Sequence, residues 1–324
     1  MYNRENYLKI RRIYDEKNLN AKKAAEARAD ELHAKYPELA KIDRVLSETG
    51  LQILAESMNG REGLEERINA LREQNAELLK ARGEYLLSLG YPADYTAVRY
   101  ECSDCQDTGF IGTKMCHCLH RDLVLAGYES SGIGRLIDKQ RFETFSLSYY
   151  NATPAEHENM ERIFSLCREY ADTFVPEKSK NLLFCGTTGL GKTHLSTSIA
   201  KVVIEKGNDV VYVTAQDLLS DFEFERFNRS YNDSDPSRTE KYGECDLLIV
   251  DDLGTEMANQ FSLSCLYNVI NTRLNRGQAM IFNTNLTQSQ LRDRYGDRIT
   301  SRLFGEFLVL QFTGKDIRLQ KVMS

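Results

Sequence analysis

The residues best suited to chemistry lie in "CGTTGLGKTH" (185–194), which contains the pattern G-x-x-x-x-G-K-[ST]. Backbone N–H groups of such a loop surround phosphate oxygens, the lysine adds a positive charge near the β- and γ-phosphates, and the hydroxyl binds Mg²⁺. Lys192 and Thr193 would take these two roles. The other candidates for nucleotide contact are Gly186, Thr187, Thr188, Gly189, Leu190, Gly191 and His194. The loop therefore predicts a site for ATP and Mg²⁺.

The elements that must position this loop are also visible in the sequence. "NLLFC" (181–185) suits a short buried parallel strand, and "THLSTSIAKVVIEKG" (193–207) spaces its apolar residues as a helix does before it ends at a glycine. A glycine turn between unrelated elements is the alternative, and these flanks disfavour it.

Two carboxylates end the apolar stretch "CDLLIVDDLG" (245–254). At the end of a strand, Asp251 could bind Mg²⁺ directly or through water, and Asp252 could orient or deprotonate the attacking water. A pair of residues capping the next helix is the alternative. Because the pair follows a phosphate loop at this distance, we favour the nucleotide role for both residues.

An amide follows the next apolar stretch, in "FNTNLT" (282–287). Asn285 could position the nucleophilic water beside the γ-phosphate, and Asn283 is the competing candidate. A turn asparagine without a role in chemistry is the alternative.

Arginines are concentrated near the end of the chain, in "RDRYGDRITSRLF" (292–304), and "GKDIR" (314–318) adds Lys315 and Arg318. An arginine presented across a subunit interface can neutralise charge on the transferring phosphoryl group. A solvated basic helix or a patch that binds the DNA backbone are the alternatives.

Four of the eight cysteines gather in "YECSDCQDTGFIGTKMCHCLHRDL" (100–123). Cys102 and Cys105 form one C-x-x-C turn, and Cys116 and Cys118 follow after a glycine-containing, hairpin-like segment. Four thiolates would satisfy a tetrahedral Zn²⁺, which we expect to be structural. The second pair is C-x-C, so His117 or His120 could replace one cysteine, and a cluster without metal is the alternative. The other four cysteines are expected to be buried thiols.

The composition sets limits on the class of protein. The chain has 324 residues, 41% of them hydrophobic, with a formal net charge of −6. Its first 20 residues do not resemble a secretory signal, and no apolar segment has the length of a membrane span, so we expect a cytosolic globular protein. The negative net charge argues against nucleic-acid binding by bulk charge and requires a local patch for any DNA contact.

The chain divides into regions of different character. Residues 1–95 predict two or three amphipathic helices that bind a partner, 96–125 a zinc-knuckle-like segment, and 126–160 a linker and the start of the core. Residues 161–324 predict an α/β ATPase domain. Its expected strands are 181–185, 209–215, 246–252 and 279–285, and its expected helices are 193–206, 216–227, 260–276 and basic helices to the end.

With these residues assembled, the chain resembles the bacterial replicative helicase loaders of the DnaC/DnaI type, in the AAA+ superfamily, and is close to the transposition helper ATPases of the IstB type. The resemblance rests on "GTTGLGKTHL", "LLIVDDLG", "NTNL", "DRITSRL" and "DIR", in that order. "CSDCQDTGFI" and "RFETFSLSYY" also resemble DnaI-type segments. The resemblance to this family covers about residues 100–320.

The resemblance implies a P-loop AAA+ core with a parallel sheet and a lid, and it implies roles for matching residues. The Walker residues would be Lys192, Thr193, Asp251 and Asp252. The first sensor would be Asn285, the trans-acting arginine finger Arg302 with Arg298 as the fallback, and the second sensor Arg318. Asp252 stands where many AAA+ proteins have glutamate, and its shorter side chain predicts slow hydrolysis.

The resemblance also implies partners. In the family the amino-terminal region grips a hexameric helicase, and a segment after the second core strand contacts single-stranded DNA. Here that segment lies within 218–243, where Phe222, Phe224, Phe227, Tyr231, Arg226 and Arg229 could contact DNA. Simple packing of these aromatic residues is the alternative.

Three functions are therefore considered. The first is an ATP-dependent loader of the replicative helicase onto single-stranded DNA, which self-associates through its ATP sites. The second is a helper of DNA transposition, which the cysteine cluster disfavours. The third is an adaptor that binds ATP without hydrolysing it.

Overall fold

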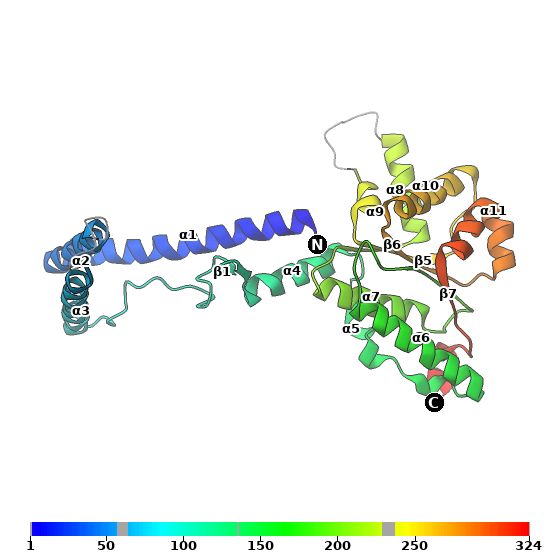
Figure 1. Cartoon of the computed structure of the whole chain (residues 1–324), viewed down its shortest axis with the longest axis horizontal. Coiled ribbons are helices and arrows are strands. Elements are labelled where there is room, and N and C mark those ends of the chain that lie inside the picture. Colours follow the sequence, from blue (N-terminus) through cyan, green and yellow to red (C-terminus); the bar gives the residue numbers. More distant parts are fainter. Residues whose placement is uncertain (1, 57–63, 135, 229–236, 324) are drawn as a thin grey trace. The chain divides into compact units, whose positions relative to one another are not determined.

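The protein is described by a computed structural model that covers residues 2–56, 64–134, 136–228 and 237–323 (Figure 1). Its contacts divide the chain into two compact units. One unit consists of residues 1–10 and 119–324, and the other of residues 11–118. No helix within the described ranges combines the length and apolar character needed to cross a membrane.

The larger unit is built on a five-stranded parallel sheet with the order β4-β5-β6-β3-β7. The strands are β3 Asn181–Cys185, β4 Val210–Thr214, β5 Leu247–Leu253, β6 Ala279–Thr284 and β7 Phe307–Gln311. The first four confirm the expected strands. All carboxyl ends meet at one edge of the sheet, where ligands bind in open α/β sheets.

Helices cover both faces of the sheet (Figure 1). The faces are covered mainly by α6 Pro154–Asp172 and α7 Lys192–Glu205 on one side and by α8 Ala215–Asn228, α10 Gln260–Arg276 and α11 Gln288–Gly305 on the other. The other helices from residue 117 onward are α4 His117–Ser130, α5 Leu136–Lys139, α9 Glu240–Glu244 and α12 Ile317–Met323. Two short 3-10 helices, Phe142–Thr144 and Leu147–Tyr149, precede α6.

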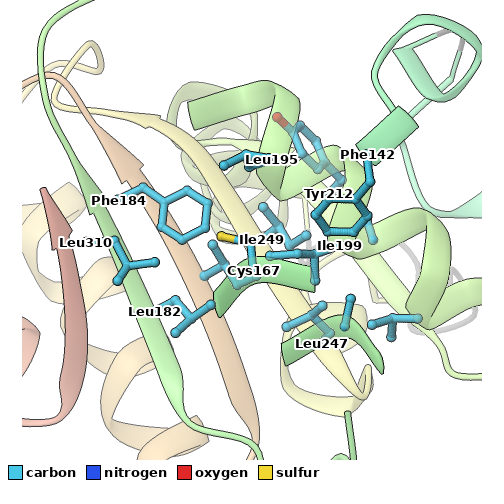
Figure 2. Close-up of a cluster of buried hydrophobic side chains, with 14 of the residues drawn as sticks. Phe142, Cys167, Leu182, Phe184, Leu195, Ile199, Tyr212, Leu247, Ile249 and Leu310 are labelled. Carbon is cyan, nitrogen blue, oxygen red and sulfur yellow. The ribbon is translucent and has the colours of Figure 1, made fainter. Parts of the chain in front are cut away.

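Alternate residues of each strand feed two separate apolar clusters, because side chains of a strand point to opposite faces. Leu182 and Phe184 of β3 pack with α6 and α7, and Figure 2 shows them beside Cys167 and Leu195. Leu183 of β3 instead packs in the cluster that α8, α10 and α11 close. The sheet is therefore buried on both faces, which accounts for the continuous apolar runs of its central strands.

One expectation for this unit needs correction. The chain after residue 285 does not consist of helices only, because Phe307–Gln311 forms the edge strand β7, paired in parallel with β3. In the segment expected to contain a linker and the start of the core, Ile133, Phe142 and Tyr150 belong to the core cluster.

The smaller unit confirms a helical region followed by a hairpin. Its helices are α1 Arg4–Lys35, which starts in the larger unit, α2 Pro37–Glu56 and α3 Leu64–Ser88. Leu32, Leu39 and Leu86 form its small apolar cluster, around which several tyrosines pack. Strands β1 Phe110–Ile111 and β2 Lys114–Met115 form the antiparallel hairpin between the two cysteine pairs.

Helix α1 also holds the segment that leads to the cysteines. Asn18 donates to the Gln106 carbonyl at 2.7 Å, and Lys17 pairs with Glu101 at 2.6 Å. Arg28 donates to the carbonyls of Tyr95 and Ala97. The helical region and the cysteine segment are thus parts of one unit in the structure.

Candidate nucleotide-binding site

The phosphate loop lies at the carboxyl end of β3 and leads directly into α7, as the motif requires. Gly191 is the N-cap of α7 with φ 82°, and a Cβ there would stand 2.9 Å from the Tyr150 hydroxyl. A Cβ on Gly189, where φ is 79°, would stand 2.0 Å from the Asp316 carboxylate. Both positions need glycine, because the left-handed backbone and these neighbours leave no room for a side chain.

Lys192 is buried, and three oxygens hold its ammonium group. Nζ donates to the carbonyls of Gly186 at 2.7 Å and Thr187 at 2.8 Å, and to Oδ1 of Asn285 at 2.7 Å. Burial lowers the pKa of Lys192 to about 8, although the carboxylates of Asp251 and Asp252 oppose the shift. The charge therefore stands in a partly dehydrated position, where an anion gains more from it than in water.

Asp251, at the end of β5, is the most completely hydrogen-bonded carboxylate of the site. Its Oδ1 accepts from Asn283 Nδ2 at 2.9 Å and from the Asp252 N–H at 3.0 Å, and Thr193 Oγ1 lies 3.4 Å away. Its Oδ2 accepts a short hydrogen bond from the hydroxyl of Tyr212, on β4. Thr193 and Asp251 are thus adjacent, as expected for two residues that share one Mg²⁺.

Asp252 differs from its neighbour in exposure and in backbone. It is exposed, lies at the edge of the cavity, and has a left-handed backbone with φ 53°. Although the residue is exposed, its carboxyl group is partly shielded from water, and this desolvation raises the pKa of Asp252. The negative charge of Asp251 raises it further. A carboxylate with a raised pKa is a better proton acceptor, which suits the role of general base.

The two asparagines at the carboxyl end of β6, the strand next to β5, have different positions. Asn285 lines the cavity and accepts from Lys192, whereas Asn283 is buried below it. Nδ2 of Asn283 donates to Ser196 at 2.8 Å as well as to Asp251. Asn285 therefore faces the nucleotide side, and Asn283 supports the carboxylate from behind.

A cavity of about 450 Å³ opens beside the loop, within the usual range for ligand pockets. Thr188, Gly189, Leu190, Gly191, Lys192, Thr193, His194, Asp252, Asn285 and Arg318 line it. Arg318 reaches it from α12, and its charge also lowers the pKa of Lys192. Residues that the sequence reading did not single out complete the wall: Gln140, Thr144, Phe145, Ser146, Tyr149, Thr255 and Ile317.

His194 joins the loop to the segment that precedes α6. Its Nε2 donates to the Arg141 carbonyl at 2.8 Å, and its ring meets that of Phe145 edge-on with centroids 5.2 Å apart. The side chain therefore shapes the apolar wall of the cavity.

The arginines of α11 do not line this cavity. Arg302 donates twice to Oδ1 of Asn271 on α10, at 2.8 and 3.2 Å, and its guanidinium lies 4.5 Å from the ring centre of Tyr267. Arg298 is exposed. Of the arginines expected at the nucleotide, the structure brings only Arg318 to the same chain's cavity.

The four cysteines of the smaller unit come together as predicted. The ligand atoms of Cys102, Cys105, Cys116 and Cys118 all lie within 4.8 Å of one another. The Sγ atoms of Cys102 and Cys116 are 3.8 Å apart, and those of Cys105 and Cys118 are 3.5 Å apart. Zn–S bonds of about 2.3 Å in a tetrahedron require Sγ separations of roughly 3.8 Å, so these residues fit the metal.

Neither histidine belongs to this cluster. Nδ1 of His117 lies 3.5 Å from Sγ of Cys116, but its side chain is mostly exposed and the four atoms that all lie close to one another are the sulfurs. Nδ1 of His120 forms a short hydrogen bond with the hydroxyl of Tyr2. The geometry therefore favours four sulfur ligands.

The segment expected to contact DNA is divided. Phe222 packs in the core cluster, whereas Phe224 and Phe227 are exposed. Arg226 lies over Phe261, 4.9 Å from the ring centre. Arg229 and Tyr231 lie outside the described residues.

A doubly covered parallel sheet, a phosphate loop at its carboxyl edge and an adjacent pair of aspartates define a P-loop nucleotide-binding protein. More particularly, residues 141–323, more than half of the chain, match the family described as IstB-like ATP binding protein, and the chain belongs to that family.

Individual relatives include proteins of DNA replication. The replicative helicase loader DnaC of Buchnera aphidicola subsp. Baizongia pistaciae is 26% identical over 189 residues, which cover 58% of this chain and 73% of the loader. The chromosomal replication initiator protein DnaA of Campylobacter fetus is 44% identical over 79 residues, 24% of this chain and 17% of DnaA. A crystal structure of the DnaC helicase loader superposes with a TM-score of 0.47 at 22% identity, covering 56% of this chain and all of that one.

Proposed function

We propose that this protein is an ATP-dependent loader of the replicative DNA helicase onto single-stranded DNA. The observation that carries the proposal is the presence in one chain of a cavity beside the phosphate loop, in the larger unit, and of a separate unit of helices and a four-cysteine cluster. Similarity to a replicative helicase loader over most of that loader's length supports the choice of client.

The cavity residues divide the work of binding and hydrolysis. The loop N–H groups and Lys192 would hold the phosphates, and Thr193 with Asp251 would hold Mg²⁺. When bound, Mg²⁺ would neutralise the charge that develops on the phosphates. Asp252 would orient or deprotonate the attacking water, assisted by Asn285, and its short side chain fits slow turnover.

Arg302 would act on a neighbouring protomer. It lies outside its own cavity, and Asn271 and Tyr267 hold it in place. An arginine fixed in this way can neutralise the γ-phosphate of the next subunit, which would make self-association depend on ATP. Arg318 would contact the phosphates of the nucleotide bound to its own subunit.

The cysteine cluster would hold one Zn²⁺, which supplies a structural cross-link between the two cysteine pairs. The smaller unit would then present its helices to the helicase. Leu79 and Leu87 of α3 are 57% and 61% exposed, and exposed apolar side chains on a helix suit a protein partner. Phe224 and Phe227 would contact single-stranded DNA by stacking.

The test measures the mass of complexes by light scattering after mixing the full chain with the host's replicative helicase, with and without ATP. We expect a complex with the wild-type chain. Leu79→Asp combined with Leu87→Asp should weaken it at least about tenfold, because charges replace apolar contacts at a protein interface. Leu125→Asp is the matched control, since Leu125 is 52% exposed but belongs to the larger unit.

If no complex forms in any nucleotide state, the proposed loader function is refuted.

Arg302→Ala should leave ATP binding unchanged and reduce ATP-dependent self-association by about tenfold or more. Turnover that stays at the level of Lys192→Ala when helicase and single-stranded DNA are present would instead support an adaptor that does not hydrolyse ATP.

A helper of DNA transposition is the second candidate, and the IstB-like family match favours it. Such a helper should coat duplex DNA in the presence of ATP and should ignore the helicase. The same scattering experiment, with duplex DNA in place of the helicase, distinguishes the two functions.

A further inference from the structure

One buried carboxylate lies outside the machinery described so far. Glu256 is 3% exposed, in the loop that joins β5 to α10. Buried carboxylates are uncommon unless they are paired, so the partners of Glu256 indicate what this loop does.

On one side, the loop is tied to the nucleotide cavity. Thr255 lines the cavity and donates to the Asp252 carbonyl through its N–H at 3.2 Å and its hydroxyl at 2.9 Å. Oε2 of Glu256 accepts from the Gly254 N–H at 2.9 Å. The loop is therefore folded tightly behind Asp252, and Glu256 closes the fold.

On the other side, the same carboxylate holds helix α11. Oε1 of Glu256 accepts a short hydrogen bond from the hydroxyl of Tyr295, which is also buried, and lies 3.6 Å from Nε of Arg294. Arg294 also donates to the backbone carbonyl of Glu256. Two successive residues of α11 thus contact one residue of the loop.

The next residue of α11 is its kink. Gly296 has φ 72° and ψ 173°, and the helix resumes after it with Arg298 and Arg302. A backbone break of this kind lets the second half of a helix change direction relative to the first. Glu256 therefore holds α11 immediately before the point at which the part that carries Arg298 and Arg302 can turn.

We propose that Glu256 is a positioning residue that transmits occupancy of the nucleotide cavity to the half of α11 beyond Gly296, which carries Arg298 and Arg302. A nucleotide that moves Asp252 and Thr255 shifts the loop, and Glu256 passes the shift to Tyr295 and so to the segment beyond Gly296. The inference deepens the proposed function, since it assumes that Arg302 acts on a neighbouring protomer.

The test is hydrogen–deuterium exchange on the full chain, with and without a non-hydrolysable ATP analogue and Mg²⁺, at a concentration where light scattering shows a monomer. In the wild type, the analogue should change the exchange of both the phosphate loop and residues 297–305. In Glu256→Gln and Tyr295→Phe, the loop should respond as before and the response of 297–305 should fall by about half or more. Tyr295→Phe keeps the packed ring, so it tests the contact in a folded protein.

Glu306→Gln is the matched control, because Glu306 is exposed just after α11. A response of 297–305 that persists in both Glu256→Gln and Tyr295→Phe, or that is absent in the wild type, would overturn the inference. ATP-dependent self-association, measured separately at higher concentration, tests the proposed function itself. If the analogue changes the exchange of 297–305 in the wild type but the protein never self-associates, the coupling through Glu256 stands. The proposed action of Arg302 on a neighbouring protomer is then refuted.

Discussion

The phosphate loop and the four-cysteine cluster both arise from short stretches of sequence, but different forces hold them. The loop follows a strand with an apolar cluster on each face of its sheet, so its backbone has a fixed support before any ligand binds. The cysteine segment has only two strands of two residues each, and its buried apolar side chains are mainly the ligands themselves. A short hairpin is marginal in water by itself, and apart from the hydrogen bonds and the ion pair that α1 makes to this segment, the proposed zinc would be its main support.

Loss of the proposed zinc site should have the largest effect and should separate the two regions. Cys105→Ser with Cys118→Ser leaves two ligands, and we expect loss of bound zinc and rapid proteolysis within residues 99–118. ATP affinity should change less than about twofold, because the larger unit has its own core. Zinc content by mass spectrometry, limited proteolysis and nucleotide titration measure these three quantities.

Ser103→Ala is the control within the same turn, since Ser103 is exposed and is not a ligand. If the double variant retains the protease resistance of the wild type, the cysteine segment does not need the metal, and the proposed difference between the two regions is wrong.

The effect of pH on ATP affinity should be smaller than the effect of losing the zinc site. It tests whether the buried Lys192 of the phosphate loop carries the charge that binds the phosphates. The pKa of Lys192 is lowered to about 8 by burial, and bound phosphates favour its charged form. Affinity should therefore be constant below about pH 8 and fall above it, by at most about tenfold per pH unit, as the free protein loses this proton. Titration with a fluorescent ATP analogue from about pH 7 to about pH 9.5 measures the slope.

Lys192→Ala should bind at least about tenfold more weakly and should lose the pH dependence, since hydrogen bonds to charged groups contribute about 1.5–3 kcal/mol. An unchanged slope in this variant would assign the titration to another group.

The smallest effect is expected at Tyr212, which supports the loop's partner carboxylate. Tyr212→Phe removes one hydrogen bond to Asp251 and keeps the ring in the core. Loss of about 1 kcal/mol corresponds to roughly a fivefold weaker apparent affinity for Mg²⁺ in the ATP complex. Magnesium titrations of ATP hydrolysis test this. Tyr149→Phe is the control: Tyr149 lines the cavity from the segment before α6, and this change should leave the magnesium dependence unchanged.

The sequence predicted the parts of the site that are contiguous in the chain. Lys192, Thr193 and the two aspartates belong to local motifs whose flanking strands are marked by apolar runs. The hydrogen bonds of Asp251 to Tyr212 and Asn283 were not predicted, because both partners lie on other strands. Asn283 was considered only as a competitor of Asn285, and a tyrosine in an apolar strand looks like any core residue. Only the order of the strands brings these side chains together.

The errors in the fold have the same origin. Phe307–Gln311 contains four consecutive apolar residues and a glutamine, a short run that periodicity cannot assign to a strand or a helix, and it follows an arginine-rich helix. The cavity wall that Phe145 and Tyr149 form comes from short 3-10 turns without a periodic signal. These elements are fixed by tertiary packing, which a local pattern does not encode.

The left-handed backbone of Asp252 limits how its chemistry can be probed. At φ 53°, asparagine and aspartate are tolerated far better than most other residues, because their short polar side chains can hydrogen-bond locally. Asp252→Glu would lengthen the acid but also impose a conformational cost of about 1 kcal/mol, so a defective glutamate variant would say little about the reach of the base. Asp252→Asn removes the charge and keeps the backbone, which makes it the cleaner substitution for separating nucleotide binding from hydrolysis.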